Sequence, residues 1–265
     1  MKFINSELIY LKDENWLQEQ RIAGQCVASC LETCGKLISS EINLSGKDLE
    51  EECYKIMQKF NCIPTFYNYS NNGKKPFPGK ICVSVNEVMV HGIPNEKLFQ
   101  EGDVIKIDLG ATYNDSVADA ATTFIKGQAK LSNHEVMIKL AKQALAKAIE
   151  MCFPGKQVGA IGNAIYKTVK DSKFGLITDY GGHGIHSHNK PHASPFVPNK
   201  SNATDGVRFQ SGMTLAIEPQ LVMGLPITRV ASDGWSVIAT GISCHEEHTI
   251  FIHENGPEVI TKWNL

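Results

Sequence analysis

Four carboxylates and one histidine stand at positions where strand ends could bring them together. Asp108 and Asp119 lie eleven residues apart, and Glu218 and Glu247 adjoin later apolar runs. His183 lies among glycines, which would let the backbone come close to a ligand. Four carboxylates in one dry cleft cannot all stay ionised without positive charge. Two divalent cations about 3.5–4 Å apart, sharing carboxylates, would supply that charge.

The ligand types narrow the choice of metal. Carboxylates combined with one imidazole suit Mn, Fe(II), Co or Zn better than calcium. The spacing alone equally permits acidic strand ends that are simply solvated and a histidine that is only hydrogen-bonded in its loop. Whether the four carboxylates and His183 come together depends on the strands and helices that carry them.

The first two carboxylates are predicted on a β-hairpin. Residues 104–109 are mostly apolar, as in a buried strand. A turn is predicted at 113–115, followed by a second strand over 117–124. A hairpin centred between Tyr113 and Asn114 would place Asp108 directly opposite Asp119, with Cβ atoms about 4.5–5.5 Å apart.

Helices are predicted around this hairpin in two similar pairs. Their expected ranges are 14–35, 46–60, 132 to just before Pro154, and 160–172. Ser45 with Asp48, and Ser132 with Glu135, have the spacing of capping boxes at helix starts.

The order of these elements indicates an internal duplication. Each helix pair precedes a glycine, four residues, an isoleucine and a carboxylate, at 102–108 and again at 212–218. We therefore predict an α+β fold over residues 1–265, one domain with pseudo-symmetric halves at about 14–125 and 132–253. If the halves face each other, Glu218 comes beside Asp108.

Composition excludes several classes of protein. The 265 residues carry a formal net charge of -2, which gives no indication of a nucleic-acid or membrane-surface partner. No apolar run approaches the roughly 18 residues of a membrane span, and the first residues lack the apolar core of a signal peptide. We expect a cytoplasmic protein.

Eight cysteines without a secretory signal predict free thiols in a reducing compartment. Cys26, Cys30 and Cys34 fall four residues apart on one helix face. A thiolate metal site is conceivable there. The absence of paired Cys-x-x-Cys spacings favours an apolar stripe facing the core.

The same residues carry a family resemblance. Five segments match, in order, the metal-ligand motifs of the pita-bread metallopeptidases: Asp108, Asp119, Gly182-His183-Gly184-Ile185, Ile217-Glu218-Pro219 and Glu247-His248-Thr249. Within that group the chain resembles type I methionine aminopeptidases of the short bacterial form, most distinctively over residues 77–94 and 233–236. The similarity runs from about Gln20 to about Gly256.

The resemblance implies a pita-bread fold, with a central antiparallel sheet covered by helices, and unequal roles for the ligands. Asp108 and Glu247 would bridge two divalent ions, Asp119 would complete one, and His183 and Glu218 the other. A hydroxide between the ions would attack the first peptide bond. Glu218 would transfer the proton.

The resemblance also implies residues that contact the substrate. His91 would contact the scissile nitrogen, and His192 would stabilise the oxyanion. Cys82, Phe77 and Trp235 would line a small apolar pocket for the methionine side chain.

The loop after His183 departs from the family. Lys190 stands where the family's second histidine is usual. His192 keeps the spacing to the following proline if the loop is two residues longer, whereas His188 is the competing candidate and His186 a weaker one. Lys74 replaces a common pocket tyrosine, so that the pocket wall would be more open or more basic.

The implied activity is removal of the initiator methionine from nascent proteins, near the ribosome, when the second residue is small. We expect a monomer with two divalent ions (Co, Mn or Fe(II), with Zn also suitable). One alternative is an Xaa-Pro peptidase, although those proteins usually carry an additional N-terminal domain. The other is a non-catalytic pita-bread binding protein, although such relatives lose ligands and here all five positions are filled.

Overall fold

The computed structural model describes residues 2–4, 7–70 and 75–263. Its helices are α1 (Glu14–Ile38), α2 (Gly46–Lys59), α3 (Ser132–Ile149) and α4 (Gly159–Val169). The strands that precede α3 are β1 (Lys2–Ile4), β2 (Glu7–Ile9), β3 (Ile63–Pro64), β4 (Cys82–Val85), β5 (Val88–Val90), β6 (Val104–Tyr113) and β7 (Ser116–Ile125). The strands that follow α4 are β8 (Gly175–Leu176), β9 (Gly182–Gly184), β10 (Ala193–Val197), β11 (Thr214–Ile217), β12 (Gln220–Val222), β13 (Thr228–Val230), β14 (Val237–Ala239), β15 (Ser243–His245), β16 (His248–His253) and β17 (Gly256–Val259).

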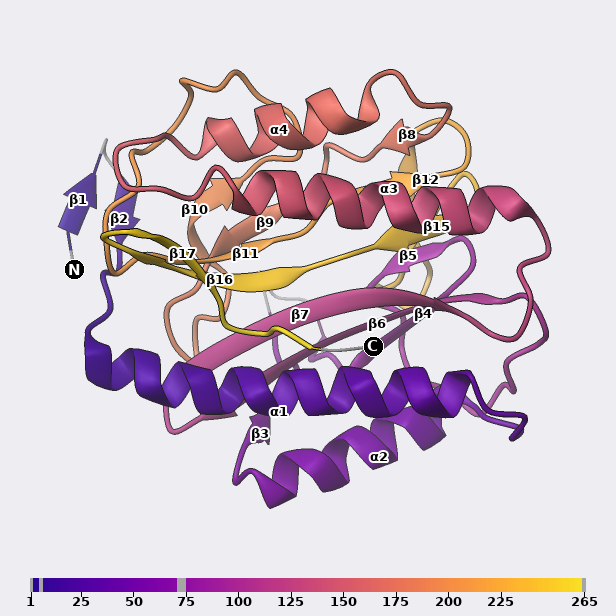
Figure 1. Ribbon diagram of the computed structural model, residues 1–265. Helices are drawn as coiled ribbons and strands as arrows, with labels where there is room; N and C mark the ends of the chain where they lie inside the picture. The colour runs from indigo at the N-terminus through magenta and orange to yellow at the C-terminus, as the bar shows by residue number, and fades with distance from the viewer. Residues whose placement is uncertain (1, 5–6, 71–74, 264–265) are drawn as a thin grey trace.

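The strands lie between two pairs of helices. Figure 1 shows α1 and α2 on one side of the strands and α3 and α4 on the other. The two main sheets are antiparallel: one contains β6 paired with β3, β4 and β7, and the other has the order β10-β9-β11-β16-β17. The predicted α+β class is confirmed. Among the described residues, no helix has the length and hydropathy needed to cross a membrane.

The helix starts differ in how they are capped. At α2 the predicted capping box is present, because Ser45 and Asp48 each bond to the other's backbone N–H. At α3 the prediction is wrong: Leu131 occupies the cap position, and no side chain accepts a bond there. The helix α1 continues past Gly35 to Ile38 and is capped at its start by Asp13.

The β6–β7 hairpin has a different register from the predicted one. Its turn consists of Asn114 and Asp115, so that Asp108 pairs with Ala121 and Asp119 pairs with Gly110. The predicted direct opposition of Asp108 and Asp119 is therefore wrong. The turn centre lies one residue later because Asn114 takes a left-handed conformation, with φ of 54°, which asparagine tolerates in tight turns. This displacement shifts each partner by two residues and keeps both aspartates on one face.

Two apolar clusters support the two sheets. One packs α1 and α2 against β6 and β7, and the other packs α3 and α4 against β11 and β16. This arrangement follows the predicted order of elements, while the duplication itself stays a prediction.

All eight cysteines are free and buried. Five of them lie in the cluster under α1 and α2, where the Sγ atoms of Cys34 and Cys53 are 3.4 Å apart. In the part of the chain that the structure describes, no three thiols lie close enough together to hold a metal ion. The stripe of cysteines therefore serves as packing surface, as the sequence favoured.

A seam between β7 and β16 joins the two sheets at the centre. The Asp119 N–H donates to Thr249 Oγ1 (2.8 Å), and the Thr249 hydroxyl donates back to the Asp119 carbonyl (2.7 Å). The Glu247 N–H donates to the Ala121 carbonyl at 2.8 Å. These bonds bring Asp119 and Glu247, which are 128 residues apart in the chain, to the same place.

Candidate metal centre and active site

The five predicted ligands come from five different segments and line one cavity. Asp108 lies on β6, Asp119 on β7 and His183 on β9, while Glu218 directly follows β11 and Glu247 directly precedes β16. All five line a cavity of about 290 Å³.

The glycines beside His183 allow close packing of strands rather than close approach to a ligand. A Cβ atom at Gly182 would lie 2.1 Å from the Ala216 carbonyl oxygen, and one at Gly184 would lie 2.1 Å from the Ser194 carbonyl oxygen. The strand β9 therefore fits between β10 and β11 only with glycine at both positions. That packing places His183 opposite Ala216, two residues before Glu218.

Among the described residues, the candidate ligand atoms form three overlapping groups of three, of which one includes His192 and the other two consist of predicted ligands alone. Oxygen atoms of Asp108, Asp119 and Glu247 lie within 4.8 Å of one another, and so do a nitrogen of His183 and oxygens of Glu218 and Glu247. Glu247 belongs to both of these groups of predicted ligands. A carboxylate shared between two neighbouring triads is the arrangement that two adjacent divalent ions require.

The electrostatics of the cavity favour positive charge. Burial, followed by the neighbouring carboxylates, raises the pKa values of Asp108 and Glu247 well above their ordinary range. Burial raises the pKa of Asp119 to about 8 and the pKa of Glu218 to about 7. Bound cations would stabilise the ionised carboxylates in place of protons.

Unpaired oxygens point to the same conclusion. Among the described residues, Asp119 Oδ1 and Glu247 Oε1 are buried without a hydrogen-bond partner. Buried polar atoms in folded proteins nearly always have partners, and an ion is one way to supply them. The residues present therefore fit a dinuclear metal site.

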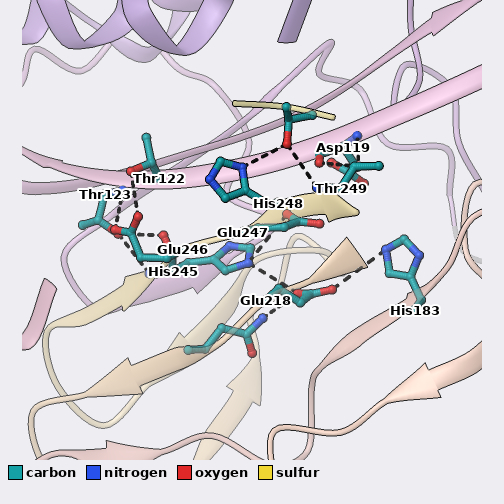
Figure 2. A network of polar contacts seen from close by, with 12 residues as sticks. Asp119, Thr122, Thr123, His183, Glu218, His245, Glu246, Glu247, His248 and Thr249 are labelled. Atoms are coloured by element: carbon teal, nitrogen blue, oxygen red, sulfur yellow. Dashed lines mark hydrogen bonds and ion pairs between the residues drawn. The ribbon is translucent and has the colours of Figure 1, made fainter. Parts of the chain in front are cut away.

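Glu218 lies between two histidines (Figure 2). Its Oε1 is 3.9 Å from His183 Nε2, and its Oε2 is 3.4 Å from His245 Nε2. The side-chain amide of Gln220 donates to Glu218 Oε2 at 2.7 Å. The hydrogen bond from Gln220 thus fixes the orientation of the Glu218 carboxylate.

His245 was missed by the sequence analysis. Its Nε2 lies 3.8 Å from Glu247 Oε2 as well as near Glu218. Burial lowers the pKa of His245 to about 3, so the ring is neutral. The available signal was its position two residues before Glu247, a spacing that places side chains on one face of an extended chain.

An apolar pocket opens from the carboxylates. Phe77, Cys82 and Trp235, the three predicted pocket residues, form a buried cluster with Phe66. The rings of Phe77 and Trp235 meet edge to face, with centroids 5.3 Å apart, and the Trp235 indole N–H donates to the Lys75 carbonyl.

Both predicted substrate-contacting histidines line the same cavity. His91 has a left-handed backbone, with φ of 57°, and its ring lies 6.4 Å from those of Tyr180 and Trp235. The ring centroid of His192 is 4.4 Å from that of His183.

The two competing histidines of the loop lie elsewhere. His188 Nδ1 is 3.1 Å from Thr112 Oγ1, and the His188 N–H donates to Asp115. His186 stacks on Tyr10 with ring centroids 3.4 Å apart, and its Nδ1 is 3.0 Å from Lys12 Nζ. These contacts of His186 and His188 hold the loop after β9 against residues outside the cavity, so that His192 is the histidine of this loop that lines the cavity.

Lys74, which we expected at the pocket wall, lies outside the described residues. The cavity wall includes Tyr69, which the sequence analysis missed.

Comparisons with known proteins agree on one family. At the level of sequence, the family model for metallopeptidase family M24 matches residues 18–254 of this chain. The chain is 36% identical to the methionine aminopeptidase of Mycoplasma capricolum over 257 residues, which cover 96% of this chain and 99% of that one. It is 34% identical to methionine aminopeptidase 1 of Bacillus subtilis, covering 96% and 100%.

Solved structures give the same result. The methionine aminopeptidase of Thermotoga maritima superimposes with a TM-score of 0.88 at 35% identity, covering 96% of this chain and all of that one. The prolidase of Pyrococcus furiosus, at 18% identity and a TM-score of 0.68, shares the fold, and the match covers 66% of its chain.

Proposed function

The chain belongs to metallopeptidase family M24 and, within it, to the methionine aminopeptidases, and from this membership we propose how its residues remove the initiator methionine. The pita-bread fold and the aminopeptidase activity that the sequence led us to expect are both confirmed by these relatives. The observation that carries the proposal is the position of two ligand triads, sharing Glu247, at the base of a small apolar pocket.

The proposed ligands are the five residues of the two triads. Asp108, Asp119 and Glu247 would hold one ion, and His183, Glu218 and Glu247 would hold the other, so that Glu247 would be shared. That Asp108 is shared as well stays a prediction. Bound divalent ions polarise the peptide carbonyl and lower the pKa of a water molecule. Co, Mn, Fe(II) and Zn all suit this ligand set.

The protein side chains orient the substrate and move protons. Glu218, held by Gln220 and beside His245, accepts the proton of the attacking water and returns it to the leaving nitrogen. His91 contacts that nitrogen, and His192 donates a hydrogen bond to the carbonyl oxygen as negative charge develops on it.

The apolar pocket selects the first residue. The methionine side chain enters between Phe77, Cys82 and Trp235, where its flexible thioether contacts aromatic rings. Shape carries this discrimination, since one methylene contributes only about 1–3 kcal/mol. We propose that the substrates are nascent chains with a small second residue, met in the cytoplasm near the ribosome by a monomeric enzyme.

The test uses the purified protein, stripped of metal and reloaded with Mn(II) or Co(II). It should release methionine from a Met-Ala-Ser peptide, and a chelator should abolish that release. No activity with any divalent metal would contradict the enzyme mechanism. Preference for Xaa-Pro peptides would instead indicate a prolidase.

A further inference from the structure

A hydrogen bond joins His192 to a residue that the proposed mechanism leaves without a role. His192 Nδ1 lies 2.9 Å from the hydroxyl oxygen of Tyr69. The two rings meet edge to face, with centroids 5.0 Å apart. The bond links the loop after β9 to the loop before β4, which are 123 residues apart in the chain.

The backbone around Tyr69 keeps its side chain in place. The Tyr69 N–H donates to the Phe66 carbonyl at 2.9 Å, and the Phe77 N–H donates to the Tyr69 carbonyl at 2.8 Å. The ring packs against the buried cluster that contains Phe66 and Phe77. The hydroxyl is therefore presented to His192 from a well-supported ring.

The direction of this bond determines the tautomer of the imidazole. A phenol O–H is a stronger donor than a neutral imidazole N–H, so the Tyr69 hydroxyl is assigned as the donor to His192 Nδ1, 2.9 Å away. Burial also raises the pKa of the Tyr69 hydroxyl, which keeps its proton in place. A neutral imidazole that accepts at Nδ1 carries its hydrogen on Nε2.

The remaining nitrogen is the one available to the substrate. A ring nitrogen of His192 lies within 4.8 Å of an Asp119 oxygen and a His183 nitrogen, beside the metal triads. With Nδ1 bonded to Tyr69, an Nε2–H donor is left to face the peptide carbonyl. The opposite tautomer would present a lone pair there and could not stabilise an oxyanion.

We propose that Tyr69 is a positioning residue, which holds His192 in the Nε2–H tautomer and orients it toward the carbonyl oxygen of the scissile bond. The kinetic part of this inference rests on the proposed function of His192. The tautomer itself can be measured without metal, substrate or turnover.

The first experiment measures that tautomer in the metal-free protein. Nitrogen-15 NMR of the histidine side chains at pH 8, with His192 assigned from the His192→Ala spectrum, should show Nε2 protonated and Nδ1 as acceptor. In Tyr69→Phe, which keeps the ring and removes the hydroxyl, the Nε2–H form should lose its predominance. Protonation of Nδ1 in the unsubstituted protein would overturn the proposal, as would an unchanged tautomer in Tyr69→Phe.

The second experiment compares kcat and KM in the reloaded enzyme. Tyr69→Phe should lower kcat by about tenfold to a hundredfold, less than the roughly 10²–10³-fold of deleting an oxyanion donor, with KM within about twofold. Tyr67→Phe is the matched control, because Tyr67 lies in the same loop with 48% of its surface exposed. It should leave both constants unchanged.

A double substitution shows whether Tyr69 acts through His192. In the His192→Ala background, Tyr69→Phe should cause no further loss of kcat. An equal loss in both backgrounds would overturn the positioning role. If His192→Ala alone were fully active, the proposed role of His192 would fail, and with it the kinetic inference, while the NMR result would still decide the tautomer.

Discussion

Asp108 and Asp119 are diagonal neighbours on the β6–β7 hairpin, and Ala121 occupies the position directly opposite Asp108. The carbonyl of the same Ala121 accepts the Glu247 N–H. The three carboxylates of one metal triad therefore meet around a residue whose side chain is a single methyl group.

Ala121 should be intolerant of larger side chains for this reason. Its Cβ lies on the face of Asp108, and directly opposed Cβ atoms are about 4.5–5.5 Å apart. Ala121→Leu should displace Asp108 and reduce the metal bound per chain, measured by elemental analysis after dialysis. The melting temperature of the metal-free variant controls for general overpacking. Full metal content in Ala121→Leu would contradict this role of the alanine.

Thr249 should contribute more to stability than an ordinary threonine. Thr249→Val keeps the shape but removes both hydrogen bonds to the Asp119 backbone, and a loss of about 2 kcal/mol in the free energy of unfolding is expected. Urea denaturation of the metal-free protein measures it. Thr168→Val is the control, since within the described part of the chain the Thr168 hydroxyl bonds only to the Ala164 carbonyl of its own helix. Equal losses in the free energy of unfolding for the two substitutions would show that the hydrogen bonds of the seam contribute no more than an ordinary threonine hydroxyl.

Glu258 should stabilise the fold in a pH-dependent way. Arg21 donates to both oxygens of Glu258 at 2.7 Å, which joins α1 to β17. The hydrogen bonds from Arg21 are the main cause that lowers the pKa of Glu258. Because the folded pKa is depressed, this stabilisation is present above the ordinary glutamate pKa of about 4.3 and is lost as the pH falls through the folded pKa.

Glu258→Gln should therefore cost about 1 kcal/mol near neutral pH, since both side chains are only about 30% exposed. The difference from the unsubstituted protein should vanish as the pH falls through the depressed pKa of Glu258. Glu51→Gln is the control, because Glu51 is 68% exposed in its pair with Lys55, and it should leave stability unchanged at every pH. A constant difference across the pH range would refute the assignment to the ion pair.

Replacing His192 and replacing His188 should have clearly different effects on kcat. His192→Ala should lower kcat by about 10²–10³-fold, the usual effect of losing an oxyanion donor. His188→Ala removes a contact with Thr112 outside the cavity and should change kcat little. The reverse order would show that the longer loop presents the other histidine to the substrate.

The sequence was most informative where chemistry constrains residue types. Each predicted ligand and pocket residue lines the cavity, because the segments that carry the family resemblance keep their order along the chain. The capping box at Ser45 was equally predictable, since it depends only on residues three apart.

Features that depend on conformation or on distant contacts were not predictable in this way. The register of the hairpin was set by the left-handed Asn114, and α3 begins after Leu131 without a side-chain cap. His245 and Tyr69 belong to the site through contacts with Glu218 and His192. His245 had one local signal, its position two residues before Glu247, whereas no local pattern marks Tyr69.

The shared position of Glu247 also bears on how the enzyme matures during synthesis. The first half of the chain supplies two aspartates, and every remaining ligand comes from residue 183 onward. A growing polypeptide that has not yet reached Glu247 lacks the carboxylate common to both triads. A dinuclear site would therefore be complete only after nearly all of the message has been translated, and metal loading would then be a late event in the life of each new molecule.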